Sequence, residues 1–449
     1  MGPSPASFRA EPLPVDWEVP PSKSLLQRAL VATAWAGGTV DWEFPGASVP
    51  RLDELGRDVA ELLSSLQGHG LDLVVGRDGW RSMSTGLADL GDGVWALGES
   101  GTSARMLAGL LAFAGRPGSK RTLKVTGSML GREQAALMGA LDLAGVRVAQ
   151  RGASPWPMDL VSGVLPRNLR LVAPSSSQEV SALLLALALE KGTQLEVEGP
   201  IPSYPYVRMT LGLLSDLGAQ WQLDQPSRQR WLATCVRPLA RPLGTGPIHF
   251  SIEADASAAA VAFAAGLLAG RPVRVTGLPR NSCQGDLRML SILRGAGAQV
   301  IEQAPGSWMV AGGLERGLDL DLSDTPDLAP PLVALAAALA GGCWGEPQPS
   351  HFAGLRTLQG KESPRLSVLT QGLNRLGLPA THDQDSLSVP VGDVGPGPLE
   401  LNPVGDHRMA FAWGLISLWL PSIRVADREC VAKSWPNFWS ALERMRPAR

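Results

Sequence analysis

The stretch PSKSLLQRAL, residues 21–30, places Lys23, Ser24 and Arg28 at the start of an apolar pattern with helical period. A helix N-terminus has unpaired backbone N–H groups and a partial positive charge, so such a segment favours a phosphate or a carboxylate as its ligand. Taken alone, the pattern is just as typical of a helix with a serine cap and scattered basic residues. Its meaning therefore depends on whether it recurs.

Helix starts of this kind do recur, at regular intervals. The predicted starts, separated by 72 to 79 residues, lie near Ser24, Thr102, Gln178, Ala256, Leu328 and His407. A second set with similar spacing lies near Asp53, Arg132, Pro205, Asp286, Pro364 and Pro436. Short runs rich in Val, Leu and Ile between the helices predict strands. Six such units, each with two helices and intervening strands, indicate internal duplication of an α/β module.

The first set of helix starts also carries the candidate chemistry. Ser, Thr and Asp are the preferred caps, and Asp255 is interpreted as a cap only. Capping does not require Lys23, Gln178, His407 or Arg408. We therefore predict two groups of helices whose N-termini face a common cleft and attract an anionic ligand.

The composition describes a globular protein with room for two or more domains, since 45% of its 449 residues are hydrophobic and 18% are charged. A net charge of −2 gives no general attraction to nucleic acid or to an anionic membrane. The apolar runs are too short for a membrane span, and the first residues lack the apolar core of a secretory signal. The four cysteines are far apart, which argues against a zinc site or a disulfide framework. We expect a cytoplasmic protein.

Nine segments in matching order resemble the enolpyruvyl transferase family, and within it the branch that acts on shikimate 3-phosphate. They are PPSKSLLQRAL, LGESGTSAR, PSSSQEVSALL, IPSYPYVRMTLGLL, IEADASAAA, DTPDLAPPLVALAA, LQGKESPRL, GDHRMAFAW and VAKSWPNFW. The resemblance implies an α/β (α+β) fold of two domains, each an inside-out α/β barrel of three βαβαββ repeats with parallel helices buried. Domain I would combine residues 1–22 with 251–449, domain II would comprise residues 23–250, and the active site would lie in the interdomain cleft.

The resemblance also implies a reaction. The enolpyruvyl group of phosphoenolpyruvate would pass to the 5-hydroxyl of shikimate 3-phosphate with release of phosphate, as a step toward chorismate and the aromatic amino acids. It implies a monomer that needs no cofactor and no metal, with glyphosate as an inhibitor at the phosphoenolpyruvate site. Because cations from both domains repel one another, we expect the free enzyme to be open and to close on shikimate 3-phosphate.

The site residues follow from the resemblance position by position. The phosphoenolpyruvate side would comprise Lys23, Gly101, Thr102, Arg132, Gln178, Arg365, Arg408 and Lys433. The shikimate 3-phosphate side would comprise Ser24, Arg28, Ser176, Ser177, Gln178, Ser203, Tyr206, Asp327, Thr357 and Lys361. Asp327 would accept the proton of the hydroxyl group, while Glu362 and Lys23 are both candidates for delivering the proton to the methylene carbon. His407 could contact the ligand or orient Arg408.

Some positions depart from the family pattern. The segment TGSMLGREQAAL lacks the Arg-Pro pair that normally follows at Arg132, and Glu99 needs a cationic partner such as Arg105. Two alternatives remain. One is a non-catalytic paralogue that binds anions. The other is enolpyruvyl transfer to UDP-N-acetylglucosamine, which is disfavoured because Ser24 follows Lys23 and the first cysteine is Cys235.

Overall fold

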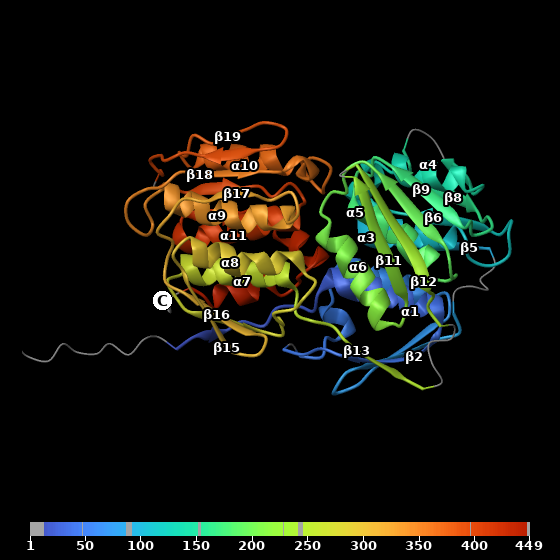
Figure 1. Ribbon diagram of the computed structural model, residues 1–449. Coiled ribbons are helices and arrows are strands. Elements are labelled where there is room, and N and C mark those ends of the chain that lie inside the picture. Colours follow the sequence, from blue (N-terminus) through green and yellow to red (C-terminus); the bar gives the residue numbers. More distant parts are fainter. Residues whose placement is uncertain are drawn as a thin grey trace, which may run out of the picture.

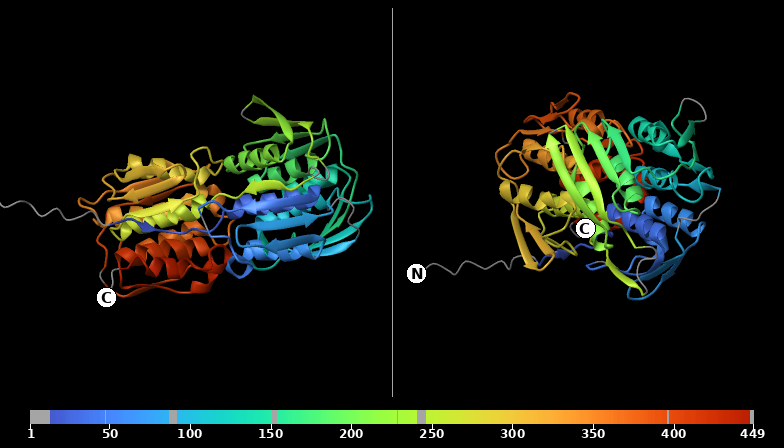
Figure 2. Two further views of the ribbon diagram at one scale, coloured as in Figure 1. Left: turned by 90° about the horizontal axis from the view of Figure 1, so that it is seen from below. Right: turned by 45° about the vertical axis from the view of Figure 1, so that its right-hand side comes forward.

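The computed structural model describes residues 13–46, 48–86, 92–150, 154–227, 229–240, 246–395 and 397–446. Two bodies of helices and sheets lie side by side, one coloured blue to green and the other yellow to red (Figure 1), and the turned views show the same two bodies (Figure 2). Each has its own hydrophobic core. The first half has a core within residues 26–252, and the core of the second half combines Trp17 and Val19 with residues 254–445. The predicted two-domain α/β fold is confirmed.

The first half contains three units of similar order. The first has helices α1 (Lys23–Ala36) and α2 (Arg57–Gln67) and strands β2 (Gly38–Glu43), β3 (Leu71–Val75), β4 (Trp80–Ser84) and β13 (Ile248–Ser251). The second has α3 (Gly101–Leu111), α4 (Ala135–Leu143), β5 (Gly93–Ala96), β6 (Lys120–Lys124), β7 (Arg147–Gln150) and β8 (Met158–Val161). The third has α5 (Ser177–Leu187), α6 (Pro205–Asp216), β9 (Asn168–Val172), β10 (Gln194–Glu198), β11 (Gln220–Ser227) and β12 (Arg230–Arg237).

The second half repeats this order. Its first unit has α7 (Ala256–Leu268), α8 (Met289–Gly295), β1 (Val15–Asp16), β14 (Val273–Thr276), β15 (Gln299–Ala304) and β16 (Ser307–Ala311). The next has α9 (Ala329–Ala340), α10 (Arg365–Arg375), β17 (Asp319–Asp321), β18 (Ser350–Ala353), β19 (Thr381–His382) and β20 (Leu387–Val389). The last has α11 (His407–Trp419), α12 (Phe438–Glu443), β21 (Leu399–Leu401) and β22 (Ile423–Val425). Short 3-10 turns are η1 (Leu52–Glu54), η2 (Gly127–Gly131), η3 (Gly285–Arg288), η4 (Pro326–Leu328), η5 (Arg356–Leu358) and η6 (Arg428–Lys433).

The sheets share one topology. In five of them the first two strands are parallel and an antiparallel hairpin completes a four-stranded sheet, as in β5-β6-β8-β7. In the described part of the last unit only β21 and β22 pair, so this unit departs from the predicted βαβαββ order.

Two strands lie next to the points where the chain passes from one half to the other. β13 pairs in parallel with β2, with Ser251 opposite Glu43, although the chain then enters α7 of the second half. β1 pairs in parallel with β14, with Val15 opposite Val273, although the chain then enters α1 of the first half. The chain therefore crosses between the halves twice, just before α1 and just before α7.

The inner helices α1, α3, α5, α7, α9 and α11 are buried on nearly all sides. Small residues permit this packing. A Cβ on Gly109 of α3 would lie 2.8 Å from the carbonyl oxygen of Ala182 on α5, so the two helices touch backbone to backbone. Side-chain caps fix several starts: Asp255 Oδ1 accepts from Ala258 N at 2.9 Å, which confirms Asp255 as a cap. In the described residues, no helix has the length and apolar character that a membrane span requires.

Candidate active site

The helix N-termini of the two halves meet at the crossings. The backbone N–H of Lys23, at the start of α1, donates to Asp255 Oδ2 at the start of α7 (3.0 Å). Within the first half, Gln27 Nε2 donates to Ser100 Oγ at the start of α3 (2.9 Å). The residues predicted from the first set of helix starts are therefore gathered where the halves face each other.

Asp327, in the 3-10 turn before α9, is the centre of one charged group. Its carboxylate lies 3.0 Å from Arg365 Nη1, 2.9 Å from Arg408 Nη2 and 3.9 Å from Lys361 Nζ. The hydroxyl of Tyr206, from the other half, donates to Asp327 Oδ2 at 3.3 Å. Burial alone would raise the pKa of Asp327, but the charges of Arg408, Lys361 and Arg365 outweigh it and hold the pKa well below its usual range. Asp327 is therefore an ionised acceptor.

Arg365, the first residue of α10, is almost fully held by carboxylates. Besides Asp327, its guanidinium contacts Asp406 through Nε (2.8 Å) and Glu362 through Nη2 (2.8 Å). Burial disfavours the charged form, yet Asp406, Glu362 and Asp327 together raise the pKa of Arg365 above its usual value. Because its N–H groups are nearly all occupied by these three carboxylates, the main role of Arg365 in this structure is to hold them in place.

Glu362 connects this group to the first half. Its Oε1 lies 3.0 Å from Nη2 of Arg132, which follows η2. Burial opposes ionisation of Glu362, but Arg132 and Arg365 outweigh it, so the pKa of Glu362 lies well below its usual range. Arg132 has further capacity, because its Nε and Nη2 are buried and make no well-directed hydrogen bond to the described residues.

A second charged group centres on Asp58, the second residue of α2. Its carboxylate lies 2.8 Å from Lys23 Nζ and 2.8 Å from Lys433 Nζ, so it bridges the two halves. Burial would raise the pKa of Asp58, but the two ammonium groups outweigh it and lower the pKa. Lys433 also donates to the backbone oxygen of Glu99 at 3.0 Å, and its Nζ lies 3.8 Å from the Glu99 carboxylate. The cationic partner of Glu99 is thus Lys433, and the expectation of Arg105 was wrong.

Arg105 instead points toward α5. Its Nη1 donates to Gln178 Oε1 and its Nε donates to Gln134 Oε1 at 2.9 Å, while Gln178 Nε2 donates to Thr102 Oγ1 at 3.0 Å. Burial lowers the pKa of Arg105 to about 10, so it remains a cation at neutral pH. Gly101 adjoins this group, because a Cβ there would lie 3.0 Å from Arg132 Nη1 and from Gln178 Oε1. Only glycine leaves this space open.

The residues predicted for shikimate 3-phosphate lie in several places. Arg28 is buried, donates to Thr210 Oγ1 (2.9 Å) and to the backbone oxygen of Ser24 (2.8 Å), and lies over the ring of Tyr206. Burial lowers its pKa to about 10. Ser176 Oγ caps α5 by accepting from Gln178 N at 3.2 Å.

Three of the predicted side chains are less connected. Ser177 is buried in the first turn of α5, and Ser203 adopts a left-handed backbone conformation just before α6. The hydroxyl of Thr357 is buried and has no hydrogen-bond partner among the described residues. The structure therefore connects Tyr206, Asp327 and Lys361 directly, but within the described part of the chain it shows no side-chain hydrogen bond that joins Ser203 or Thr357 to them.

His407 is buried edge-on against Phe411, with ring centroids 5.7 Å apart. Burial, assisted by the charge of Lys23, lowers the pKa of His407 well below its usual value, so the imidazole is neutral. Its Nδ1 lies 3.7 Å from Asp406 Oδ1.

The sequence interpretation missed Asp58 and the true direction of Arg105. An acid in the first turn of a helix is ordinarily a partner of the helix dipole. The sequence pattern could have indicated Asp58, because its position places it on the same, buried side of α2 as Leu62, Ser65 and Leu66. A carboxylate on a buried helix face needs a cationic partner.

Comparison with known proteins gives a consistent result. Residues 11–442 match the family model described as EPSP synthase (3-phosphoshikimate 1-carboxyvinyltransferase). A 3-phosphoshikimate 1-carboxyvinyltransferase from Syntrophobacter fumaroxidans is 33% identical over 353 residues, covering 78% of this chain and 79% of that protein. One from Nostoc sp. is 30% identical over 441 residues, covering 97% of both.

Solved structures agree in fold. The EPSP synthase of Acinetobacter baumannii superposes with a TM-score of 0.71 at 21% identity, covering 97% of this chain and 96% of that one. The enolpyruvyl transferase NikO of Streptomyces tendae superposes with a TM-score of 0.68 at 18% identity, covering 97% of this chain and 95% of that one. These two likenesses concern the fold alone.

Proposed function

The chain belongs to the EPSP synthase (3-phosphoshikimate 1-carboxyvinyltransferase) family, and from this premise we infer that the charged groups between its halves are the active site. The enzyme transfers the enolpyruvyl group of phosphoenolpyruvate to shikimate 3-phosphate and releases phosphate, in the route to the aromatic amino acids. The assignment of residues to the steps is our proposal.

We propose the domain division that the sequence predicts, residues 23–250 and residues 1–22 with 251–449, with its second boundary moved so that Ser251 and Ile252 join the first of these domains. Two observations support this division: Ser251 ends strand β13 in the first-half sheet, and Ile252 belongs to the first core while Ala254 belongs to the second. Residues 1–12 and 447–449 lie outside the described part of the chain.

Arg132 carries the proposal for phosphoenolpyruvate. A buried guanidinium with undirected N–H groups is costly unless a ligand uses them. Arg132 lies beside the open space at Gly101, and Gln178 borders the same space. The two parallel N–H groups of the guanidinium suit either the carboxylate or the phosphate of phosphoenolpyruvate. Lys23, Lys433 and Arg408 would supply the remaining positive charge.

Proton transfer divides between the two charged groups. Asp327 is ionised and accepts a hydrogen bond from the Tyr206 hydroxyl. It is therefore placed to accept the proton of a hydroxyl group on the shikimate ring. Glu362 is held ionised by Arg132 and Arg365, which favours Lys23 for delivering the proton to the methylene carbon. The surrounding cations would stabilise the departing phosphate.

Phosphate release tests the function. We expect release with phosphoenolpyruvate and shikimate 3-phosphate and none when UDP-N-acetylglucosamine replaces the shikimate. Lys23→Met and Asp327→Ala should abolish turnover in a protein that still folds, although each loses a partner of a buried ion pair and should unfold at a lower temperature. Lys191→Met, at an exposed position, should leave both turnover and the unfolding temperature unchanged. A folded protein that binds both substrates without releasing phosphate would instead indicate the non-catalytic paralogue.

We further propose that the enzyme is a cytoplasmic monomer that uses no metal or cofactor. The support is chemical, since the site's own cations and carboxylates provide the charge stabilisation and the proton transfers that the reaction needs. Light scattering during size-exclusion chromatography and turnover after treatment with EDTA test the oligomeric state and the metal requirement.

A further inference from the structure

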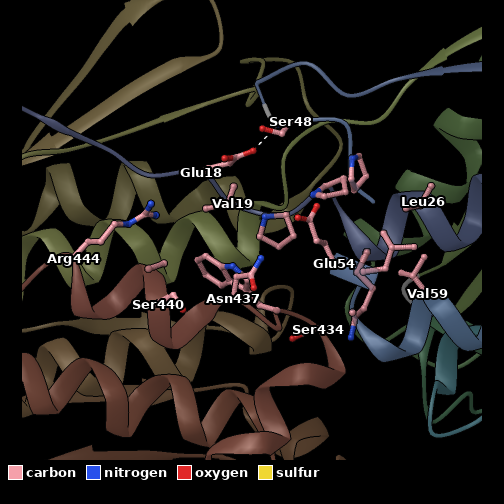
Figure 3. A pocket seen from close by; sticks show the side chains of 18 residues that line it. Glu18, Val19, Leu26, Ser48, Glu54, Val59, Ser434, Asn437, Ser440 and Arg444 are labelled. Atoms are coloured by element: carbon pink, nitrogen blue, oxygen red, sulfur yellow. Dashed lines mark hydrogen bonds between the residues drawn. The ribbon is translucent and has the colours of Figure 1, made fainter. Parts of the chain in front are cut away.

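A cavity of about 290 Å³ lies where the chain crosses between the halves, and Lys23, which pairs with Asp58, is among the residues that line it (Figure 3). Its walls come from three segments: the crossing at residues 18–23, residues 48–59 leading into α2, and residues 434–444 at α12. Residues 18–23 connect the second half to the first, residues 48–59 belong to the first half, and residues 434–444 belong to the second half. Any occupant of the cavity therefore touches both halves.

The floor of the cavity is apolar and buried. Val19, Leu55, Val59 and Trp435 line it, and all four side chains are buried. The ring of Trp435 is held by Trp17, with centroids 6.3 Å apart. A volume of this size at the boundary of two domains suits a small ligand with an apolar body.

One edge of the cavity presents unused hydrogen-bond donors. Asn437 and Arg444 flank α12 and Ser440 lies within it, at spacings of three and four residues, and Figure 3 shows the three side chains along the same edge. Within the described residues none of these three side chains has a hydrogen bond or an ion pair. An arginine fork beside an amide and a hydroxyl is suited to a carboxylate.

The other side of the cavity is acidic. Glu54 lies across from Arg444 in Figure 3, and Glu18 lies above the floor. Glu54 accepts from the backbone N–H of Arg51 (3.2 Å) and Glu18 accepts from that of Ser48 (2.6 Å), but neither carboxylate has a cationic side chain within 4.0 Å among the described residues. These carboxylates would repel a simple anion and attract an ammonium group.

We propose that this cavity binds a small zwitterion whose carboxylate and ammonium groups stand at opposite ends of an apolar ring. The carboxylate is bound by Arg444, Asn437 and Ser440, the ring covers Trp435, and the ammonium group is bound at Glu54. Such a ligand connects α12 of the second half to the segment before α2 of the first half.

Calorimetry on the full chain tests the proposal with 4-(aminomethyl)benzoate as probe, beside 4-methylbenzoate and 4-methylbenzylamine, which each lack one charge. The two ion pairs lie at an accessible rim, so we expect the zwitterion to bind about three- to fivefold more tightly than either analogue. Arg444→Gln should remove the preference over 4-methylbenzylamine, and Glu54→Gln should remove the preference over 4-methylbenzoate. Arg316→Gln and Glu346→Gln, exposed positions away from the cavity, serve as controls.

A cavity-filling variant separates this site from the catalytic one. Ser440→Trp places a ring in the cavity from an exposed position and should abolish binding of the probe while phosphate release continues. The proposal is overturned if the probe does not bind or if it binds equally to all these variants. It is also overturned if phosphoenolpyruvate displaces the probe while Arg444→Gln leaves its affinity unchanged, because the probe would then occupy the catalytic site.

Discussion

Asp58→Asn is the substitution whose effect the structure defines most sharply. The Asp58 carboxylate is 4% exposed and lies 2.8 Å from both Lys23 Nζ and Lys433 Nζ. Asparagine has nearly the same shape but no charge, so the substitution leaves two ammonium groups facing each other across the halves. Removing one partner of a buried ion pair costs about 3–5 kcal/mol, because the remaining charge stays desolvated. For a domain of 150–250 residues, this corresponds to a fall in unfolding temperature on the order of 10 °C.

Thermal unfolding measures this effect, and added phosphate tests its cause. Inorganic phosphate can take the place of the lost carboxylate between Lys23 and Lys433, so we expect it to raise the unfolding temperature of the variant more than that of the wild type. The pKa of Asp58 is lowered in the folded state. Its contribution is therefore present at neutral pH and is lost as the pH falls through the folded pKa, so the two proteins should converge in acid.

The control is Asp53→Asn, which removes an exposed carboxylate paired with Arg51 a few residues away. Solvent screens an exposed pair of this kind, so this variant should unfold close to the wild type. An Asp58→Asn protein that also unfolds within 2 °C of the wild type, or that gains no more from phosphate than the wild type does, would refute the reasoning.

Three further substitutions test separate parts of the site. Gly101→Ala adds a methyl group 3.0 Å from Gln178 Oε1, and we expect a several-fold higher KM for phosphoenolpyruvate with little loss of stability; an unchanged KM would contradict this. Burial, with Asp327 nearby, raises the pKa of Asp286 to about 6, so the stability contributed by this group falls as the pH rises from 4 to 6. At pH 7.5, Asp286→Asn should then have a higher free energy of unfolding than the wild type, by at most about 3 kcal/mol, and should unfold at a higher denaturant concentration. At pH 4 this difference should disappear. Tyr206→Phe removes the 3.3 Å hydrogen bond to Asp327 and should raise the KM for shikimate 3-phosphate more than it lowers kcat.

The sequence predicted the inner helices closely because their starts carry local signals. The predicted starts differ by at most one residue from those of α1, α3, α5, α7, α9 and α11. Ser22, Ser100 and Asp406 cap three of them through their side chains. The outer helices were placed less well. The helix expected near Asp53 is α2 from Arg57, and the one expected near Asp286 is α8 from Met289, because 3-10 turns precede both.

The sequence led to predictions of cations for the site but gave no indication of the ion pairs that the structure shows. A lysine or arginine where a cap would suffice is visible in the sequence, and this is why Lys23 and Arg408 were predicted as site residues. The partner of each cation depends on which segments the fold brings together. Asp58 is 375 residues from Lys433 in the chain, and the departure from the family pattern around Arg132 gave no indication that this guanidinium would reach Glu362.

The expected repulsion between the halves must be revised in one respect. Asp58 and Glu362 lie between the cations of the two halves and join them through Lys433 and Arg132. Two other cations have no such neighbour, since the buried Arg28 and Arg105 make no ion pair with any carboxylate among the described residues. Substrate anions therefore meet two kinds of positive charge. At Arg28 and Arg105 an anion supplies a missing partner, whereas at Lys23 and Lys433 it competes with the Asp58 carboxylate for the same donors. We therefore expect substrate binding to exchange one set of ion pairs for another, with a smaller gain in free energy than simple neutralisation of facing cations would give.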